Sequence, residues 1–267
     1  MLPLNAYLSL DGTTMDYIRF GSGKKVLIIL PGLGDGLKTV RGTAIPMSLA
    51  YHCFAKDYTV YGFSRKNDLP EGWTTRDMAD DLAKAMDLLN ISKADLLGVS
   101  MGGMIAQYFA ANYPEKLGKL VLAVTCARPS PTLTQSVSQW MESAKQGDHT
   151  ALMDSNVRQI YSDDYYRKNK WMIPIVGKLT KPKSYDRFFV QAEACKNHDC
   201  FALLPRISAP TLVIGGMQDR IVGCEAAKEI ASQIPNATLK LYDQWGHSVY
   251  EEAVDFNPTV LAFLNQT

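Results

Sequence analysis

The sequence lacks both an excess of charge of either sign and any long apolar run. Its 28 Lys and Arg residues nearly balance 27 Asp and Glu residues, which gives a formal net charge of +1. A balanced chain has no overall field to attract nucleic acid, so we expect no nucleic-acid partner. Nowhere do about 18 apolar residues follow one another, and the opening MLPLNAYLSLDG has neither a basic start nor a long apolar segment. We therefore expect no membrane span and no standard export signal.

Cysteine is too scattered for a small secreted domain held together by disulfides. The five cysteines are Cys53, Cys126, Cys195, Cys200 and Cys224. An odd number spread over a long chain favours a reducing compartment, and we expect a cytoplasmic protein. The segment CKNHDC places His198 between Cys195 and Cys200, which resembles an incomplete metal site, but no second cluster supplies the remaining ligands of a closed zinc site. We expect no metal.

The chain does have enough apolar sequence for a full core, at 46% apolar and 21% charged residues. Residues 7–10 and 15–20 alternate in polarity on either side of Asp11-Gly12, which predicts an antiparallel hairpin. Four other runs are continuously apolar: KVLIIL (25–30), ADLLGV (94–99), LVLAV (120–124) and TLVIGG (211–216). Continuous apolar runs are typical of parallel strands that helices cover on both faces.

Helical periodicity lies between these strands. The segment from Thr74 to Leu89 repeats apolar residues on one face and gathers aspartates near its start, where the helix dipole favours negative charge. Residues 104–113 and 225–234 show a similar pattern, and each ends near a proline. Alternating strands and helices predict an α/β fold with a doubly wound, mostly parallel sheet.

One long segment breaks this alternation. Residues 128–205 are aromatic and basic and contain no convincing apolar strand, so we predict a mostly helical insertion. The chain then divides into a core of residues 1–127 and 206–267 and an inserted cap of residues 128–205. The excess of basic residues in the cap suits either a rim that attracts anionic substrates or an ordinary solvated surface.

The clearest chemical signal lies at one strand-to-helix corner. The stretch LLGVSMGGMIAQYF runs from an apolar strand into a helical pattern through Gly98-Val99-Ser100-Met101-Gly102, which fits G-x-S-x-G. Small neighbours allow the serine to adopt strained backbone angles while its hydroxyl stands free at the C-terminal edge of the sheet. A serine hydroxyl is a weak nucleophile that needs a base within hydrogen-bond reach, and the base needs an orienting acid. Ser100 is therefore the candidate nucleophile.

The base and the acid follow from elimination and chain order. Of the four histidines, His247 follows the predicted strand TLKLY (238–242) in a loop at the sheet edge. The others, for which we expect surface or packing roles, are His52, His149 and His198. Asp219 follows the strand at 211–216 and lies between nucleophile and base in chain order. Asp243 is the alternative acid, because it lies only four residues before His247. The acid has to accept from the ring nitrogen that faces away from Ser100, and a loop from an adjacent strand approaches that side better than the loop of the histidine itself, so we predict Asp219 as the acid.

Acyl transfer also needs two N–H donors for the developing oxyanion. One should come from Met101, directly after the nucleophile, and the other from Leu33 in PGLGDG (31–36). A dinucleotide loop is the rival interpretation of this glycine-rich segment, but position 37 is leucine where G-x-G-x-x-G needs glycine. We expect no cofactor.

The segments ILPGLGDG, TTRDMADDLAKAMDLL, LLGVSMGGMIAQYFAANYPEKLGKLVL, ISAPTLVIGGMQD and WGHSVYEE together resemble the α/β-hydrolase superfamily over essentially the full chain. The resemblance implies a mixed, mainly parallel sheet, a lid formed by the insertion, and the Ser-Asp-His triad already argued. Many relatives carry His-Gly at the oxyanion loop, where this chain has Pro31-Gly32. Dehalogenases and epoxide hydrolases of this kind use aspartate at the corner where this chain has Ser100, so neither activity is favoured.

These features predict a cofactor-independent serine hydrolase that acts on a small-molecule acyl substrate, with a carboxylic ester as the expected class. The aromatic residues expected to line a pocket beneath the lid are Trp140, Trp171, Phe188 and Phe189. Carbon–carbon bond hydrolysis, acyl transfer and perhydrolysis share this machinery. A ligand-binding receptor of the same fold is the alternative from another class. The sequence leaves the natural substrate and homo-oligomer formation open.

Overall fold

A computed structural model describes residues 2–266, and within them the chain forms one sheet of eight strands. The strands are β1 (Leu4–Leu10), β2 (Thr13–Gly21), β3 (Lys25–Leu30), β4 (Tyr58–Lys66), β5 (Ala94–Val99), β6 (Leu117–Ala123), β7 (Thr211–Gly216) and β8 (Ala237–Tyr242). Their order across the sheet is β1-β2-β4-β3-β5-β6-β7-β8. β2 is antiparallel to β1 and β4, and the other neighbouring pairs are parallel. The predicted mostly parallel α/β sheet is confirmed.

The predicted hairpin forms because its turn sequence suits the twist of the strands. Asp11 and Gly12 join β1 to β2 with φ of 49° and 82°, the left-handed conformation that a tight two-residue hairpin turn requires. Aspartate and glycine tolerate this conformation better than most residues. The turn fixes the register that pairs Leu10 with Thr13.

β4 is a central strand that the sequence patterns did not predict. Its residues are almost all buried, but the last three are Ser64, Arg65 and Lys66. Polar residues break the apolar run by which a covered strand is recognised. Burial of the Lys66 ammonium is tolerated because two neighbours compensate its charge: its Nζ lies 3.1 Å from Asp81 Oδ1 and over the Trp73 ring.

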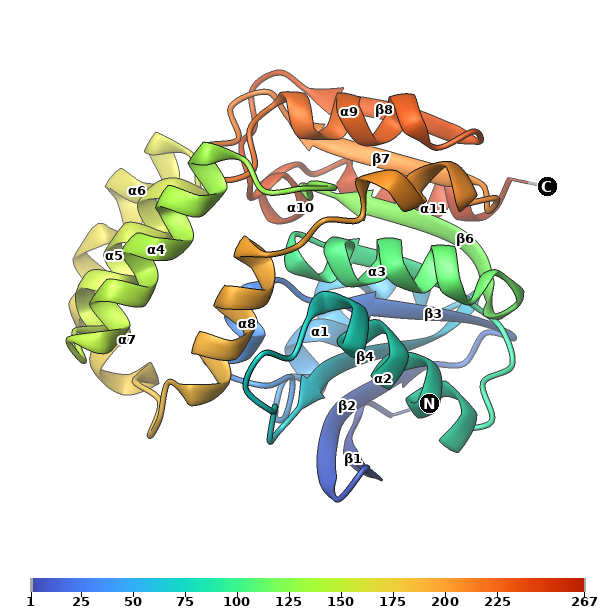
Figure 1. Cartoon of the computed structure of the whole chain (residues 1–267), viewed down its shortest axis with the longest axis horizontal. Helices are drawn as coiled ribbons and strands as arrows, with labels where there is room; N and C mark the ends of the chain where they lie inside the picture. Colours follow the sequence, from blue (N-terminus) through green and yellow to red (C-terminus); the bar gives the residue numbers. More distant parts are fainter. Residues whose placement is uncertain (1, 267) are drawn as a thin grey trace.

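Helices cover both faces of the sheet (Figure 1). The α-helices are α1 (Ala44–Ala50), α2 (Thr75–Leu88), α3 (Met101–Asn112), α4 (Pro131–Lys145), α5 (His149–Ile160), α6 (Asp163–Asn169), α7 (Ile173–Thr180), α8 (Asp186–Lys196), α9 (Glu225–Gln233), α10 (Val249–Glu252) and α11 (Phe256–Leu264). The 3-10 turns are η1 (Leu33–Gly36), η2 (His52–Phe54), η3 (Pro114–Lys116), η4 (Lys170–Met172) and η5 (Phe201–Arg206). α2, α3 and α9 pack on one face, and α1 and α11 pack on the other.

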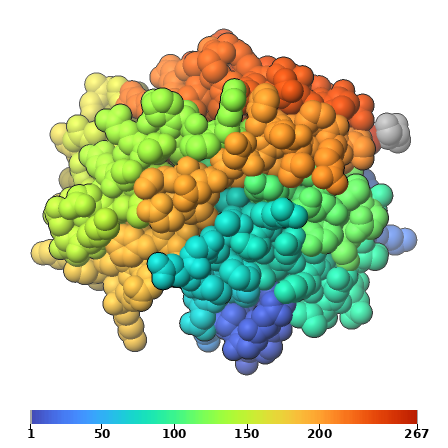
Figure 2. Space-filling view, viewed as in Figure 1, coloured from blue at the N-terminus to red at the C-terminus, as the bar shows by residue number. Residues whose placement is uncertain are grey.

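The segment between β6 and β7 is helical, as its sequence predicts. Helices α4 to α8 stand beside the sheet edge at which the parallel strands end (Figure 1). The insertion and the core form one continuous surface on the face shown in Figure 2. The exact boundaries at residues 128 and 205, and the role of a lid, stay predictions. Among residues 2–266, no helix combines the length and the apolar character that crossing a bilayer requires.

Candidate active site

Ser100 stands at the corner between β5 and α3 in a strained backbone conformation. Its φ of 53° and ψ of −120° lie in a region that residues other than glycine rarely adopt. Two glycines allow the corner to close. A Cβ on Gly98 would lie 2.6 Å from the Gly102 carbonyl oxygen, and a Cβ on Gly102 would lie 2.1 Å from the Leu30 carbonyl oxygen. The glycines on either side of Ser100 are thus required by close backbone packing.

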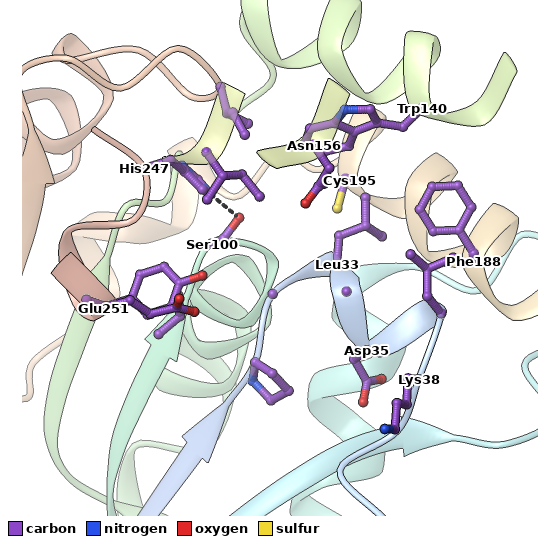
Figure 3. Close-up of a pocket in the computed structure, with 18 of the residues that line it drawn as sticks. Leu33, Asp35, Lys38, Ser100, Trp140, Asn156, Phe188, Cys195, His247 and Glu251 are labelled. Carbon is purple, nitrogen blue, oxygen red and sulfur yellow. Dashed lines mark hydrogen bonds between the residues drawn. The ribbon is translucent and has the colours of Figure 1, made fainter. Parts of the chain in front are cut away.

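The side chains of Ser100, His247 and Asp219 form one continuous chain of hydrogen bonds. Ser100 Oγ lies 2.9 Å from His247 Nε2 (Figure 3), and His247 Nδ1 lies 2.8 Å from Asp219 Oδ2. The three residues follow β5, β8 and β7, whose parallel arrangement brings their ends to one edge. An ionised carboxylate only accepts hydrogen bonds, so Nδ1 donates to Asp219 and Nε2 faces the serine hydroxyl as an acceptor.

Asp219, rather than Asp243, is the carboxylate in contact with the histidine. Besides the contact through Oδ2, Asp219 Oδ1 accepts from the backbone amides of Ile221 at 2.8 Å and Val222 at 3.0 Å. These two bonds fix the orientation of the carboxylate. Asp243 is closer to His247 in sequence, but its side chain is exposed to solvent. The loop after β7 therefore supplies the acid to a histidine in the loop after β8.

Two backbone amides beside Ser100 have no acceptor within their own helices. Met101 is the first residue of α3 and Leu33 is the first residue of η1, and amides in the first turn of a helix lack an intrahelical acceptor. The loop that carries Leu33 passes close to the serine, since a Cβ on Gly32 would lie 3.3 Å from Ser100 Cβ. Leu33 and Ser100 border the same space in Figure 3. Their role as oxyanion donors stays a prediction.

A buried cluster of charges, which the sequence patterns did not indicate, holds the loop after β3. Asp35 Oδ2 accepts from the Arg65 backbone amide at 3.1 Å and from Arg187 Nη2 at 2.5 Å. Arg65 Nη2 donates to the Pro31 carbonyl at 2.7 Å. Arg187, on α8, also donates to three backbone carbonyls of η1 and β4. The cluster ties the inserted helix α8 to the loop that lies against the nucleophile.

A cavity of about 490 Å³ lies between the sheet edge and the insertion and opens on Ser100. Trp140 from α4 and Phe188 from α8 line it, as expected from the sequence (Figure 3). The other two aromatic expectations are wrong. Trp171 lies on η4 with 67% of its surface exposed, and Phe189 is half-buried outside the cavity. Successive residues of a helix point about 100° apart, and here Phe188 faces the cavity while Phe189 does not.

The cavity wall also includes polar residues that sequence reasoning missed. Figure 3 shows Lys38, Asn156, Cys195 and Glu251 around it, from the loop after η1 and from α5, α8 and α10. Charges of both signs therefore border the cavity. Burial raises the pKa of the Cys195 thiol to about 12, which makes it a neutral thiol and not a second nucleophile.

The CKNHDC segment packs against the core. His198 Nδ1 lies 2.9 Å from Thr75 Oγ1, and burial lowers the pKa of the ring to about 3, so the imidazole is neutral. Tyr108 contacts the same ring edge to face. Within residues 2–266, no group of three His, Cys, Asp or Glu side chains is arranged to hold a metal ion.

The strand order, the strained serine corner and the helices inserted beside the strand ends are together those of an α/β hydrolase. The chain belongs to the alpha/beta hydrolase fold family, whose model matches residues 25–254.

Related proteins support this membership but differ in their reactions. The chain is 26% identical over 243 residues to a Pseudomonas savastanoi pv. phaseolicola protein named "Putative carbamate hydrolase RutD", covering 90% of this chain and 93% of that one. It is 28% identical over 282 residues to a 2-hydroxy-6-oxononadienedioate/2-hydroxy-6-oxononatrienedioate hydrolase of Burkholderia vietnamiensis, covering 96% and 93%.

Solved structures of the same fold include an α/β hydrolase, MGS-M2, from a Medee basin deep-sea metagenome library. It superposes with a TM-score of 0.87 at 26% identity, covering 98% of both chains. An enol-lactonase from Burkholderia xenovorans has a TM-score of 0.82 at 24% identity, covering 98% of this chain and all of that one, and this likeness concerns the fold alone. The chain is therefore a member of a hydrolase family in which the bond cleaved varies.

Proposed function

We propose that the protein is a cofactor-independent serine hydrolase that cleaves carboxylic esters of small to medium size through an acyl-enzyme on Ser100. The observation that carries the proposal is the unbroken hydrogen-bond chain from Asp219 through His247 to Ser100, whose serine and histidine line the cavity. A nucleophile, a base in contact with it and a third group that orients the base are the requirements of covalent acyl transfer.

Each residue has a defined task in the proposed reaction. His247 Nε2 takes the Ser100 proton while Oγ attacks the ester carbonyl, and the amides of Leu33 and Met101 donate to the resulting oxyanion. The C–O bond then breaks, and His247 returns the proton to the leaving alcohol. A water molecule, deprotonated by the same nitrogen, attacks the acyl-enzyme and releases the acid and the serine hydroxyl. Asp219 stabilises the imidazolium in both steps.

A second candidate is carbon–carbon bond hydrolysis beside a ketone. The substrate in the name of the Burkholderia vietnamiensis relative contains an oxo group and two carboxylates but no ester or amide. Hydrolysis of such a molecule into two parts has to break a carbon–carbon bond. The same serine, base and oxyanion donors serve this reaction, so the two candidates differ in the substrate and not in the triad.

The test combines a covalent probe with a substrate panel. A fluorophosphonate probe should label the wild-type protein and should not label Ser100→Ala, which should stay folded and lose nearly all turnover. The panel holds p-nitrophenyl esters of increasing chain length, an aryl carbamate and a 2-hydroxy-6-oxo dienoate. The absence of labelling in the wild type would favour a receptor, and substantial hydrolysis by Ser100→Ala would refute the mechanism.

Chelation provides an independent check. The triad and the two amides need no metal, so ester hydrolysis should survive exhaustive treatment with EDTA. A loss of activity that zinc restores would show that a metal takes part, and the proposed chemistry would then be wrong.

A further inference from the structure

The outer side of the insertion carries large exposed apolar side chains that the proposed reaction does not use. They are Trp171 (67% exposed), Met172 (40%), Ile175 (55%) and Leu179 (80%), on η4 and α7. Single exposed apolar residues are ordinary on protein surfaces, but several large ones at adjacent positions indicate a surface that binds a protein partner or a membrane. We call these four residues, with the lysines named below, the α7 patch.

The fold needs only one side of α7. Ile173 and Gly177 face inward, and a Cβ on Gly177 would lie 3.1 Å from Thr150 Cα, so α7 lies tightly against α5. Ile175 and Leu179 are four residues apart and therefore share one side of the helix, which is exposed. Figure 1 shows α7 at the outer end of the insertion, remote from the central strands. The apolar character of the outer side is thus not explained by packing within the chain.

The segment that carries these apolar residues is rich in positive charge. Residues 165–185 contain six Lys and Arg residues and no Asp or Glu, although the whole chain carries only +1. The segment has five exposed lysines that form no ion pair within residues 2–266. Lys181 donates to the Gly147 carbonyl, and the ammonium groups of the other four, Lys168, Lys170, Lys178 and Lys183, form no hydrogen bond among these residues either. A partner must therefore offer both an apolar layer and negative charge.

We propose that the α7 patch binds the anionic surface of a phospholipid bilayer, peripherally and without crossing it. Helices with lysines beside Trp and aliphatic residues lie in the interfacial plane, where the apolar side chains enter the boundary of the acyl region and the lysines contact anionic headgroups. A second copy of this chain fits less well, because a symmetric contact would bring two sets of unpaired lysines together.

The patch adjoins the cavity that contains the nucleophile. Thr180, the last residue of α7, and His149, the first residue of α5, both line that cavity. A protein held by the α7 patch therefore places the insertion side of its cavity next to the bilayer, where apolar acyl compounds concentrate. This consequence for substrate supply rests on the proposed function, whereas the binding of the bilayer does not.

Sedimentation with vesicles tests the binding without any measurement of turnover. Vesicles of phosphatidylcholine alone are compared with vesicles that contain about one third phosphatidylserine, at ionic strengths from about 0.05 M to about 0.5 M, over which screening becomes strong. We expect the wild-type protein to sediment with the anionic vesicles at low salt, to be released at high salt, and to bind the neutral vesicles weakly.

Two sets of variants separate the charged and apolar contributions. Lys168→Gln, Lys170→Gln and Lys178→Gln together should weaken binding about a hundredfold, since each lysine near such a surface contributes about 1 kcal/mol. Ile175→Ser with Leu179→Ser should weaken it at least about tenfold.

The matched control is Ile45→Ser with Leu49→Ser, an equally spaced pair of exposed aliphatic residues on α1, a helix without charged residues. This variant should bind like the wild type, and thermal melting should show that all variants are folded. Failure of the folded wild type to bind anionic vesicles at low salt would overturn the proposal, as would equal losses in the α1 control. A dimer that Ile175→Ser dissociates would assign the patch to a second copy. Because Ser100 labelling is not involved, these outcomes are independent of the proposed hydrolase reaction.

Discussion

Replacing Asp219 by asparagine tests the orientation of His247, because the structure fixes how the new amide must turn. Asp219 Oδ1 accepts from the backbone amides of Ile221 and Val222 at 2.8 and 3.0 Å. An NH₂ group cannot accept, so the asparagine oxygen has to keep that position and the NH₂ has to face His247 Nδ1. Nδ1 must then accept a hydrogen bond, and the ring proton moves to Nε2, which faces Ser100.

An N–H directed at the serine cannot remove its proton. The same substitution in a serine-protease triad lowers kcat by about 10⁴ while the geometry stays intact. We expect a similar loss here, equivalent to ~5 kcal/mol of activation free energy. The protein should remain folded, since the asparagine oxygen keeps both backbone hydrogen bonds. Asp243→Asn is the matched control, and its exposed side chain predicts a loss of about tenfold or less.

The assay is kcat for hydrolysis of one p-nitrophenyl ester by both variants at about pH 8, above the titration range of free histidine. Fluorophosphonate labelling rates provide a second readout that does not depend on deacylation. A large loss in Asp243→Asn beside a small loss in Asp219→Asn would reverse the assignment of the acid. Near-normal kcat in both variants would show that neither carboxylate orients the base.

Three further predictions concern other parts of the molecule. Asp35→Asn leaves two guanidinium groups without their buried counter-charge, so the free energy of unfolding in urea should fall by about 3–5 kcal/mol, and a change near zero would contradict a buried ionic cluster. Phe188→Ala should change the dependence of kcat/KM on the chain length of the ester, whereas Phe189→Ala, which lies outside the cavity, should not. Equal effects of the two substitutions would show that the substrate does not bind in this cavity. Burial lowers the pKa of His198 from 6.5 to about 3. As the pH is lowered, the unfolded chain therefore binds a proton before the folded chain does, and the free energy of unfolding decreases. Between about pH 7 and pH 5, the free energy of unfolding in urea should fall by about 2 kcal/mol more for the wild type than for His198→Asn. An equal fall in the two proteins would refute this.

The parts of the fold that follow from local patterns were predictable. β3, β5 and β7 match the apolar runs at residues 25–30, 94–99 and 211–216, because a covered parallel strand is apolar throughout and polar residues mark its ends. β4 was missed because Arg65 and Lys66 are buried in it. Their charges are compensated by residues distant in sequence, and no local pattern reports such a pairing.

The candidate site also has a part that could be predicted from the sequence and a part that could not. Ser100, Asp219 and His247 follow strands, and the parallel sheet brings strand ends to one edge, so topology predicts that the three residues lie near one another, and the loop geometry then places Asp219 rather than Asp243 on the histidine. The orientation of the inserted helices does not follow from topology, because it depends on packing between segments far apart in the chain. Trp171, which was expected in the cavity, is exposed on the surface. The hydrogen bond between Asp35 and Arg187 joins residues that are 152 positions apart in the sequence.

The attachment of α8 by Arg187 bears on how parts of this fold can be exchanged between proteins. Within the described residues, the bonds from the insertion to η1 and to the carbonyls of β4 come from α8. A chimaera that receives a foreign segment in place of residues 131–180 keeps those bonds, so it can acquire a new cavity roof without disturbing the loop beside Ser100. A chimaera cut at residue 205 instead leaves Asp35 and Arg65 buried without Arg187. The natural junction for grafting thus lies between α7 and α8, inside the insertion and not at its end.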